Sequence, residues 1–196
     1  MTGRVLVAPR EIVDVVYRAS RVAGADSGVA SMLGRSACFA VGQLGSDLSH
    51  VVEALDEGQA PPLGFVPVAK VESGGFAVDG SLVVDAATYS VADLAYAAFS
   101  ACTRGCVVSM VCGDGVVHAP HSWLSTGRSA LLIEELRVEK REVDAGLAAR
   151  VTARHDEALR HGLSIPETTW RALADRATPY LVPERLIDAA EGEPAN

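Results

Sequence analysis

The side chains with the most reactive chemistry gather in one stretch of the chain, residues 90–121. It contains Cys102, Cys106, Cys112, His118 and His121. Thiolates and imidazoles are typical ligands of structural zinc, but zinc sites bring ligand pairs together across short turns. Cys106 and Cys112 instead fall at the two ends of a predicted strand, about 20 Å apart by strand rise. We therefore expect no metal site and interpret the cysteines as buried, reduced thiols, and a metal-binding protein that uses the cysteines and His118 stays a third possibility.

The same stretch does not indicate a nucleophile or a phosphate site. Cys106 follows the predicted end of a helix, where the helix dipole disfavours a thiolate. Ser109 lacks the flanking glycines of a nucleophile elbow. No helix begins directly after Gly113-Asp114-Gly115, so this segment predicts a hairpin turn rather than a phosphate cradle.

Acid–base chemistry and carboxylate binding are the remaining possibilities. His50 and His118 are the candidate catalytic residues, because an imidazole exchanges protons near neutral pH. Arg104, Arg128 and His121 are candidate substrate-binding residues, since a guanidinium binds a carboxylate through two hydrogen bonds. The alternative for each of these side chains is an ordinary solvated position on the surface.

The elements that position these residues can be read from the local pattern. Ser90 is a candidate N-cap for an alanine-rich helix over 92–101 that ends at Gly105. The valine-rich run 106–112 predicts a strand, and Asp114-Gly115 predicts a hairpin turn into a second strand at 116–118.

The N-terminal region predicts helices. Apolar residues at helical spacing indicate a helix over 9–24, and a second helix, capped by Ser27, that ends at Gly45. Asp47 opens a shorter third helix. The segment 58–64, GQAPPLG, interrupts all periodicity and is the best candidate for a linker.

Strands are predicted after the linker, at 65–72, 76–78 and 81–85, and again within 130–143. The second half of this last run has charged residues at alternate positions, which predicts an edge or half-exposed strand. Gly146 is interpreted as a separator, and 155–162 is ambiguous. Helices follow at about 166–177, capped by Ser164, and at 184–190, before a tail at 191–196.

The composition suits one mixed α/β domain over 1–196. We divide it into a helical part (1–57), the linker, a mixed part (65–190) containing a central mixed sheet and C-terminal helices, and the tail. Apolar residues make up 49% of the 196 residues, enough for a core. The net charge of −8 argues against nucleic-acid binding. Because no apolar run approaches membrane-spanning length or a signal-peptide core, we expect a cytoplasmic protein without membrane association.

Two resemblances bear on function. Glu11-Ile12, Ala23-Gly24, Pro166, Trp170 and the segment 177–180 resemble a bacterial family of uncharacterised proteins of about this length, which implies no activity. Residues 8–115 distantly resemble the malate, L-lactate and ureidoglycolate dehydrogenases, whose fold is not a Rossmann fold.

The dehydrogenase resemblance rests on Ser49-His50, Gly58 to Pro62, Val78-Asp79-Gly80 and the strand that begins after Gly105. It implies an α/β domain that dimerises and binds NAD or NADP together with a 2-hydroxy acid. The family's Asn-x-x-His-Phe-Gly motif is missing, and His118 lies two residues later than the histidine of that motif.

Two function classes follow. The leading hypothesis is a small-molecule enzyme, or enzyme subunit, similar to NAD(P)-dependent 2-hydroxy-acid oxidoreductases. The alternative is a non-catalytic binding or assembly protein that retains the fold as a dimerisation or partner surface. Both hypotheses predict a homo-oligomer or a partner subunit, and the first predicts a small-molecule ligand.

Overall fold

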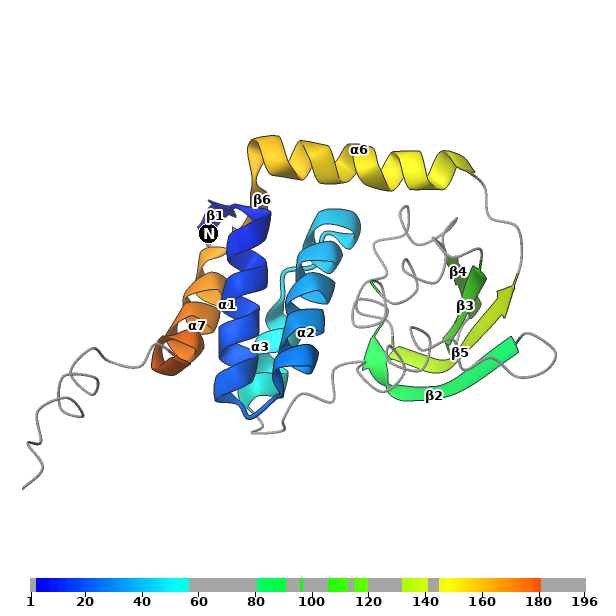
Figure 1. Ribbon diagram of the computed structural model, residues 1–196, viewed down its shortest axis with the longest axis horizontal. Helices are drawn as coiled ribbons and strands as arrows, with labels where there is room; N and C mark the ends of the chain where they lie inside the picture. The colour runs from blue at the N-terminus through cyan, green and yellow to red at the C-terminus, as the bar shows by residue number, and fades with distance from the viewer. Residues whose placement is uncertain are drawn as a thin grey trace, which may run out of the picture.

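The computed structural model describes residues 3–56, 81–90, 96, 106–112, 115–119, 132–140 and 145–180. Helices gather on one side of the molecule and a sheet on the other, and a long helix, α6, crosses above both (Figure 1). The described residues therefore combine helices with a small antiparallel sheet, which agrees with a protein of mixed helix and strand content.

The N-terminal helical hairpin is present as predicted. Helix α1 (Pro9–Val22) begins with proline, and its stripe of Ile12, Val16 and Ala19 is fully buried. Gly24 then adopts a left-handed φ of 94°, which ends the helix and turns the chain.

The second helix, α2 (Ser27–Phe39), is capped by Asp26 and not by Ser27. Asp26 has extended backbone angles, and its carboxylate accepts a hydrogen bond of 2.9 Å from the Val29 N–H, whereas Ser27 is already helical. The helix continues into a π-helical turn, η1 (Ala40–Leu44), which ends at Gly45 with a φ of 69°. The predicted end at Gly45 is correct, but the change of helix type was not predicted.

The third helix, α3 (Ser49–Asp56), begins after a strained residue. Leu48 has a φ of 63°, uncommon for a side chain with a Cβ, and is fully buried. The Asp47 carboxylate accepts hydrogen bonds from the backbone N–H and the hydroxyl of Ser49, so Asp47 opens the helix as expected.

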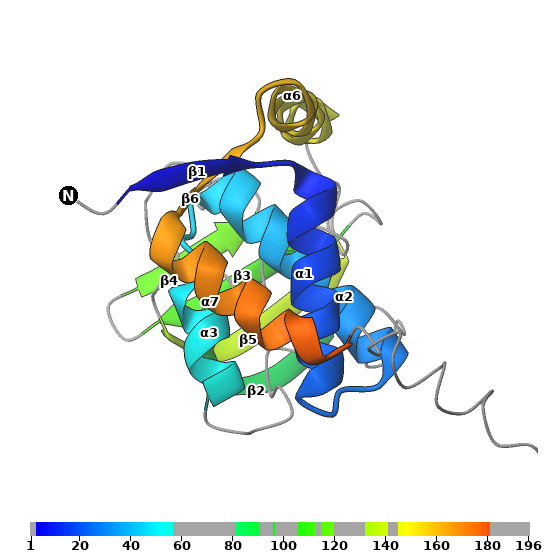
Figure 2. The same ribbon diagram turned by 90° about the vertical axis from the view of Figure 1, so that its left-hand side faces the viewer.

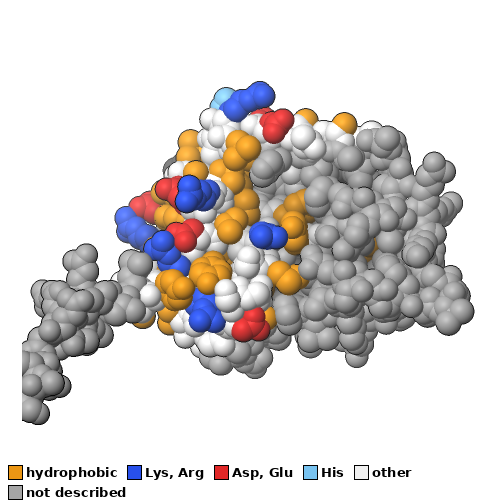
Figure 3. All heavy atoms as spheres, viewed as in Figure 1, with side chains coloured by type: hydrophobic (Ala, Val, Ile, Leu, Met, Phe, Trp, Pro, Cys, Tyr) orange, Lys and Arg blue, Asp and Glu red, His pale blue; other side chains and the backbone are white. Residues whose placement is uncertain are grey.

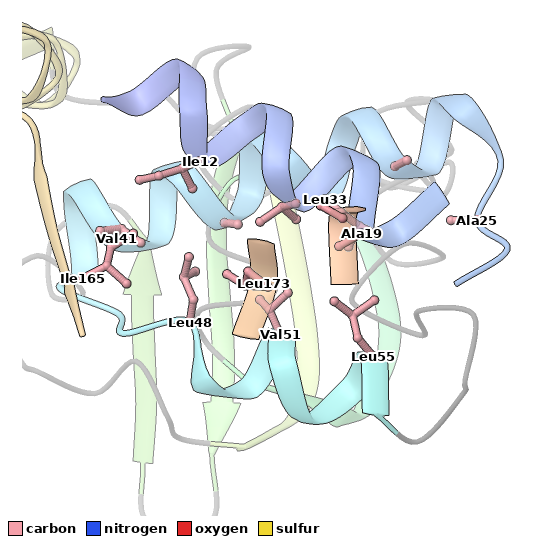
Figure 4. Close-up of a cluster of buried hydrophobic side chains, with 14 of the residues drawn as sticks. Ile12, Ala19, Ala25, Leu33, Val41, Leu48, Val51, Leu55, Ile165 and Leu173 are labelled. Atoms are coloured by element: carbon pink, nitrogen blue, oxygen red, sulfur yellow. The ribbon is translucent and has the colours of Figure 1, made fainter. Parts of the chain in front are cut away.

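The C-terminal segment completes the helical core. Strand β1 (Arg4–Val7) pairs antiparallel with β6 (Leu163–Pro166), and α7 (Glu167–Ala177) packs on α1, followed by the short turn η3 (Thr178–Tyr180). Ile165 and Leu173 lie in the same cluster as Ile12, Leu33 and Leu48 (Figure 4). The core therefore unites the first and last described segments of the chain.

One prediction about this region is wrong, and one strand was missed. Ser164 does not cap a helix: it lies in β6, where its hydroxyl accepts a hydrogen bond of 2.8 Å from Arg4 Nε. The cap position of α7 is Pro166, which has no side-chain acceptor. Strand β1 was not predicted, because four residues with a single partner strand have little periodicity to detect.

The larger sheet has the order β2-β5-β3-β4, from strands β2 (Ser81–Ser90), β5 (Leu132–Lys140), β3 (Cys106–Cys112) and β4 (Gly115–Ala119). All pairings among these strands are antiparallel, in place of the mixed sheet that was expected. Ser90 is the last residue of β2, and the start of the helix that it was predicted to cap lies outside the described residues. Cys112 lies opposite Gly115, which confirms the predicted hairpin.

Strand β5 is an interior strand, which corrects the predicted edge position. It pairs with β2 on one side and with β3 on the other. Its charged residues mark a solvent-facing side of the sheet: Arg137 is exposed and forms an ion pair with Glu135. The alternation of charged and apolar residues in β5 indicates which face of the sheet is exposed to water. It does not indicate whether the strand has one hydrogen-bonded neighbour or two.

Helix α6 (Ala145–His161) covers the segment that the sequence left ambiguous, and Gly146 lies inside its first turn. Figure 2 shows α6 nearly end-on, above the β1–β6 ribbon and the other helices. Its tertiary contacts among the described elements are mainly with η1.

Several predicted elements lie outside the described residues: the linker 58–64, the strands at 65–72 and 76–78, the helix at 92–101 apart from helical Tyr96, the helix at 184–190 and the tail. Within the described part of the chain, no helix has both the length and the apolar character needed to cross a bilayer.

Candidate functional site

The predicted site residues are spread over different parts of the fold. His50 is half-buried in the first turn of α3. His118 lies in β4 opposite Ser109, and its side chain is outside the described residues. Arg104, His121 and Arg128 also lie outside them.

Asp47 and His50 both lie at the start of α3. The pKa of Asp47 is lowered first by the hydrogen bond from the Ser49 backbone N–H, then by the Ser49 hydroxyl, and to a lesser degree by the electrostatic influence of His50. Among the residues whose side chains are described, no group of three or more His, Cys, Asp or Glu residues is placed to hold a metal ion.

The clearest concave feature is a pocket of about 370 Å³ beneath α6, which we call the apolar pocket. Its walls come from α1, α2, η1, α6 and β6, together with Tyr96. Apolar groups dominate the lining: Pro9, Val13, Phe39, Tyr96, Ala158 and Leu163. Arg35, Gln43 and Thr152 supply the polar groups.

The walls of the apolar pocket are held in place from two sides. Phe39 and Tyr96 meet edge to face, with ring centroids 6.0 Å apart, which favours a fixed orientation of both rings. Gly42 faces Leu163: a Cβ at position 42 would lie 3.7 Å from the Leu163 side chain. The absent side chain of Gly42 therefore helps to keep the space open.

Cys38 is the thiol of this pocket, and it is not an activated nucleophile. Burial raises its pKa to about 11, so the thiol is protonated at neutral pH. A reactive cysteine requires the opposite, a thiolate stabilised by nearby positive charge. Cys38 therefore contributes packing and polarisability to the pocket wall.

A second pocket, of about 260 Å³, adjoins the first; we call it the polar pocket. The two share Gly42, Ala158 and Leu163, and the polar pocket adds Arg154, Glu157 and His161 from α6. In Figure 3 basic, acidic and histidine side chains gather over the end of α6 that leads into β6, with hydrophobic side chains directly below.

Arg154 connects α6 to the opposite wall. Its Nη1 donates a hydrogen bond of 3.0 Å to the backbone carbonyl of Gln43 in η1. Gln43 is 6% exposed, so the bond joins a surface cation to a buried turn. A π-helical turn alters the regular carbonyl ladder, and such turns are frequent at functional sites.

None of the described residues that line these two pockets was a candidate in the sequence, and the described His50 lines neither pocket. One local signal was present: Gly42 interrupts an otherwise helical apolar pattern, and a glycine there often reflects close packing or function. The α6 residues carried no such signal because their partners lie more than a hundred positions earlier in the chain.

The arrangement can enclose a small molecule with an apolar body and offer it polar groups at one end. In comparisons with protein-family models, curated proteins and solved structures, the chain matches none.

Proposed function

We propose that this protein binds a small, largely apolar molecule in the apolar pocket beneath α6. The observation that carries the proposal is the pocket itself: about 370 Å³, within the range of ligand sites (roughly 300–1,000 Å³), and lined mainly by apolar groups. A few polar side chains at its margin match the usual composition of small-molecule sites.

Binding without covalent chemistry suits this pocket best. Its one thiol, Cys38, is kept protonated by burial. A pocket with rigid apolar walls gains affinity by excluding water from the ligand, at about 25 cal/mol for each Å² of apolar surface removed. The proposal thus favours the binding protein over the enzyme among the two function classes.

A pair of Gly42 variants tests the proposal. Gly42→Leu places a branched side chain against Leu163 and fills the pocket, whereas Gly42→Ala adds only a methyl group at ordinary contact distance. We expect the neutral probe N-phenyl-1-naphthylamine to bind the natural protein and Gly42→Ala alike. Gly42→Leu should bind it at least about tenfold more weakly.

Circular dichroism of both variants controls for folding. Equal probe binding by Gly42→Leu and the natural protein would refute this site. Mass spectrometry of material extracted from the purified protein provides a second readout, in which an apolar small molecule should accompany the natural protein and Gly42→Ala but not Gly42→Leu.

A second candidate is the 2-hydroxy-acid oxidoreductase that the sequence resembles. The observation in its favour is the electrostatic interaction of His50 with Asp47, because a nearby carboxylate favours the protonated form of an imidazole that acts in proton transfer. In this proposal His50 and His118 act as acid and base, and Arg104 or Arg128, with His121, binds the substrate carboxylate.

NAD(P)H fluorescence and turnover with a panel of 2-hydroxy acids test the second candidate. Turnover that is lost in His50→Ala or His118→Ala and retained in Gly42→Leu would favour it over a binding function. No cofactor binding and no turnover would exclude it.

A further inference from the structure

We infer that the ligand of the apolar pocket is an amphiphilic carboxylate, with its chain in that pocket and its head group on Arg154. This inference rests on the proposed function and adds the chemical class of the ligand. It depends on three features: the adjoining positions of the two pockets, the edge of the Arg154 guanidinium that has no partner among the described residues, and the charge of the described lining.

The two pockets adjoin. Gly42, Ala158 and Leu163 line both, so a molecule whose body occupies the apolar pocket has the polar pocket beside one end. The described lining of the apolar pocket is mainly apolar, whereas the polar pocket is lined by the charged side chains of Arg154 and Glu157. A ligand that matches both has a hydrocarbon body and a charged or strongly polar end.

Arg154 presents the geometry that binds a carboxylate. Only its Nη1 has a partner among the described residues, the Gln43 carbonyl at 3.0 Å. The edge formed by Nε and Nη2 keeps its donors, and this edge binds a carboxylate through two parallel hydrogen bonds. The bond to Gln43 also restrains the guanidinium, which lowers the entropy lost when a ligand binds.

The local charge favours an anion. Among the described residues that line the two pockets, the charged side chains are Arg35, Arg154 and Glu157, a net charge of +1 with histidine counted as neutral. The whole chain carries −8, so this described lining has the opposite sign to the chain as a whole and favours an anion. A cationic amphiphile would face Arg154 with like charge.

Three probes with the same chain and different head groups test the inference on the natural protein: decanoate, decanol and decylamine. In isothermal titration calorimetry we expect decanoate to bind at least about tenfold more tightly than either of the others. Equal affinity for decanoate and decanol would overturn the carboxylate assignment and leave the proposed function intact. Failure of all three probes and of N-phenyl-1-naphthylamine would overturn both.

Variants of α6 locate the head group. Arg154→Gln should reduce the affinity for decanoate about tenfold more than the affinity for decanol, because any shift of α6 affects both probes alike, while Arg160→Gln, an exposed cation of the last turn that lines neither pocket, should change neither. Arg154→Lys keeps the charge but loses the two-bond geometry, so an intermediate affinity is expected. Unchanged decanoate affinity in Arg154→Gln would exclude Arg154 as the binding group.

Discussion

The Arg154 side chain donates a hydrogen bond from Nη1 to the Gln43 carbonyl, across 111 positions of sequence. This bond connects α6 to η1, and its acceptor residue Gln43 lines the apolar pocket while Arg154 lines the polar pocket. Among the described elements, α6 makes its main contact with η1, and the bond is part of that contact.

Arg154→Ala should therefore destabilise the attachment of α6. Loss of a charge-assisted hydrogen bond to a partly buried carbonyl should lower the free energy of unfolding by about 1 kcal/mol. Urea denaturation measures this change, and Arg160→Ala on the same helix is the matched control. Equal losses in the two variants would show that the Gln43 bond does not hold the helix.

Gly34 marks the closest approach of α1 and α2. A Cβ at this position would lie 2.6 Å from the Val13 carbonyl oxygen, an atom of the backbone that cannot move aside. Gly34→Ala should destabilise the protein by about 1–3 kcal/mol because the two helices must separate.

Gly42→Ala is the control for that change, since its Cβ meets only the Leu163 side chain at 3.7 Å. Alanine is the better helix former by about 1 kcal/mol, so this variant should be as stable as the natural protein or more so. Thermal unfolding of Gly34→Ala and Gly42→Ala tests this expectation. Similar melting temperatures for the two variants would contradict the close approach of the helices at Gly34.

The Cys38 thiol should react slowly with alkylating reagents. Burial raises its pKa to about 11, so at pH 8 only about one thiol in a thousand is ionised. Modification by iodoacetamide, followed by mass spectrometry of the Cys38 peptide, should be about a hundredfold slower in folded protein than in urea. The rate should increase with pH up to about 11; rapid modification at pH 7 would contradict a buried, neutral thiol.

Asp47 should make stability depend on pH at the acid end. Its folded-state pKa is lowered, first by the Ser49 backbone N–H, so its contribution is complete above the unfolded pKa of about 3.9. The contribution is lost as the pH falls through the lower folded value. Because the side chain is exposed, we expect about 0.5 kcal/mol at neutral pH.

Asp47→Asn tests this expectation because asparagine still accepts the Ser49 N–H but carries no charge. The difference in unfolding free energy between the natural protein and the Asp47→Asn variant, from urea denaturation at pH 7 and pH 2.5, should shrink at the lower pH. Ser49→Ala, which removes one of the two donors, should show a smaller pH dependence than the natural protein. A difference that is constant with pH would argue against the charge of Asp47.

The sequence by itself determined the local elements whose signals lie within a few residues. Pro9 and the stripe of Ile12, Val16 and Ala19 specified α1, and Gly24 and Gly45 specified its end and that of the following helix. The valine-rich run 106–112 specified β3 for the same reason. Helical spacing, strand alternation and positive φ are properties of short segments, so a single sequence reveals them.

Only the tertiary structure decided the partners of those elements. Nothing local distinguishes β5 as an interior strand, since its two neighbours come from segments far away in the chain. The pairing of β1 with β6, and the position of α7 beside α1, likewise join the two ends of the described chain. Hydrophobic burial selects such contacts without regard to sequence distance.

The candidate site belongs to this second category. Its walls come from residues near 9, 40, 96 and 160, brought together when the C-terminal segment packs on the N-terminal helices. The sequence directed attention to cysteines and histidines because their chemistry is visible in a single residue. A pocket is a property of the space between elements, and Gly42, where the absence of a side chain keeps that space open, acquires its role only once Leu163 lies opposite.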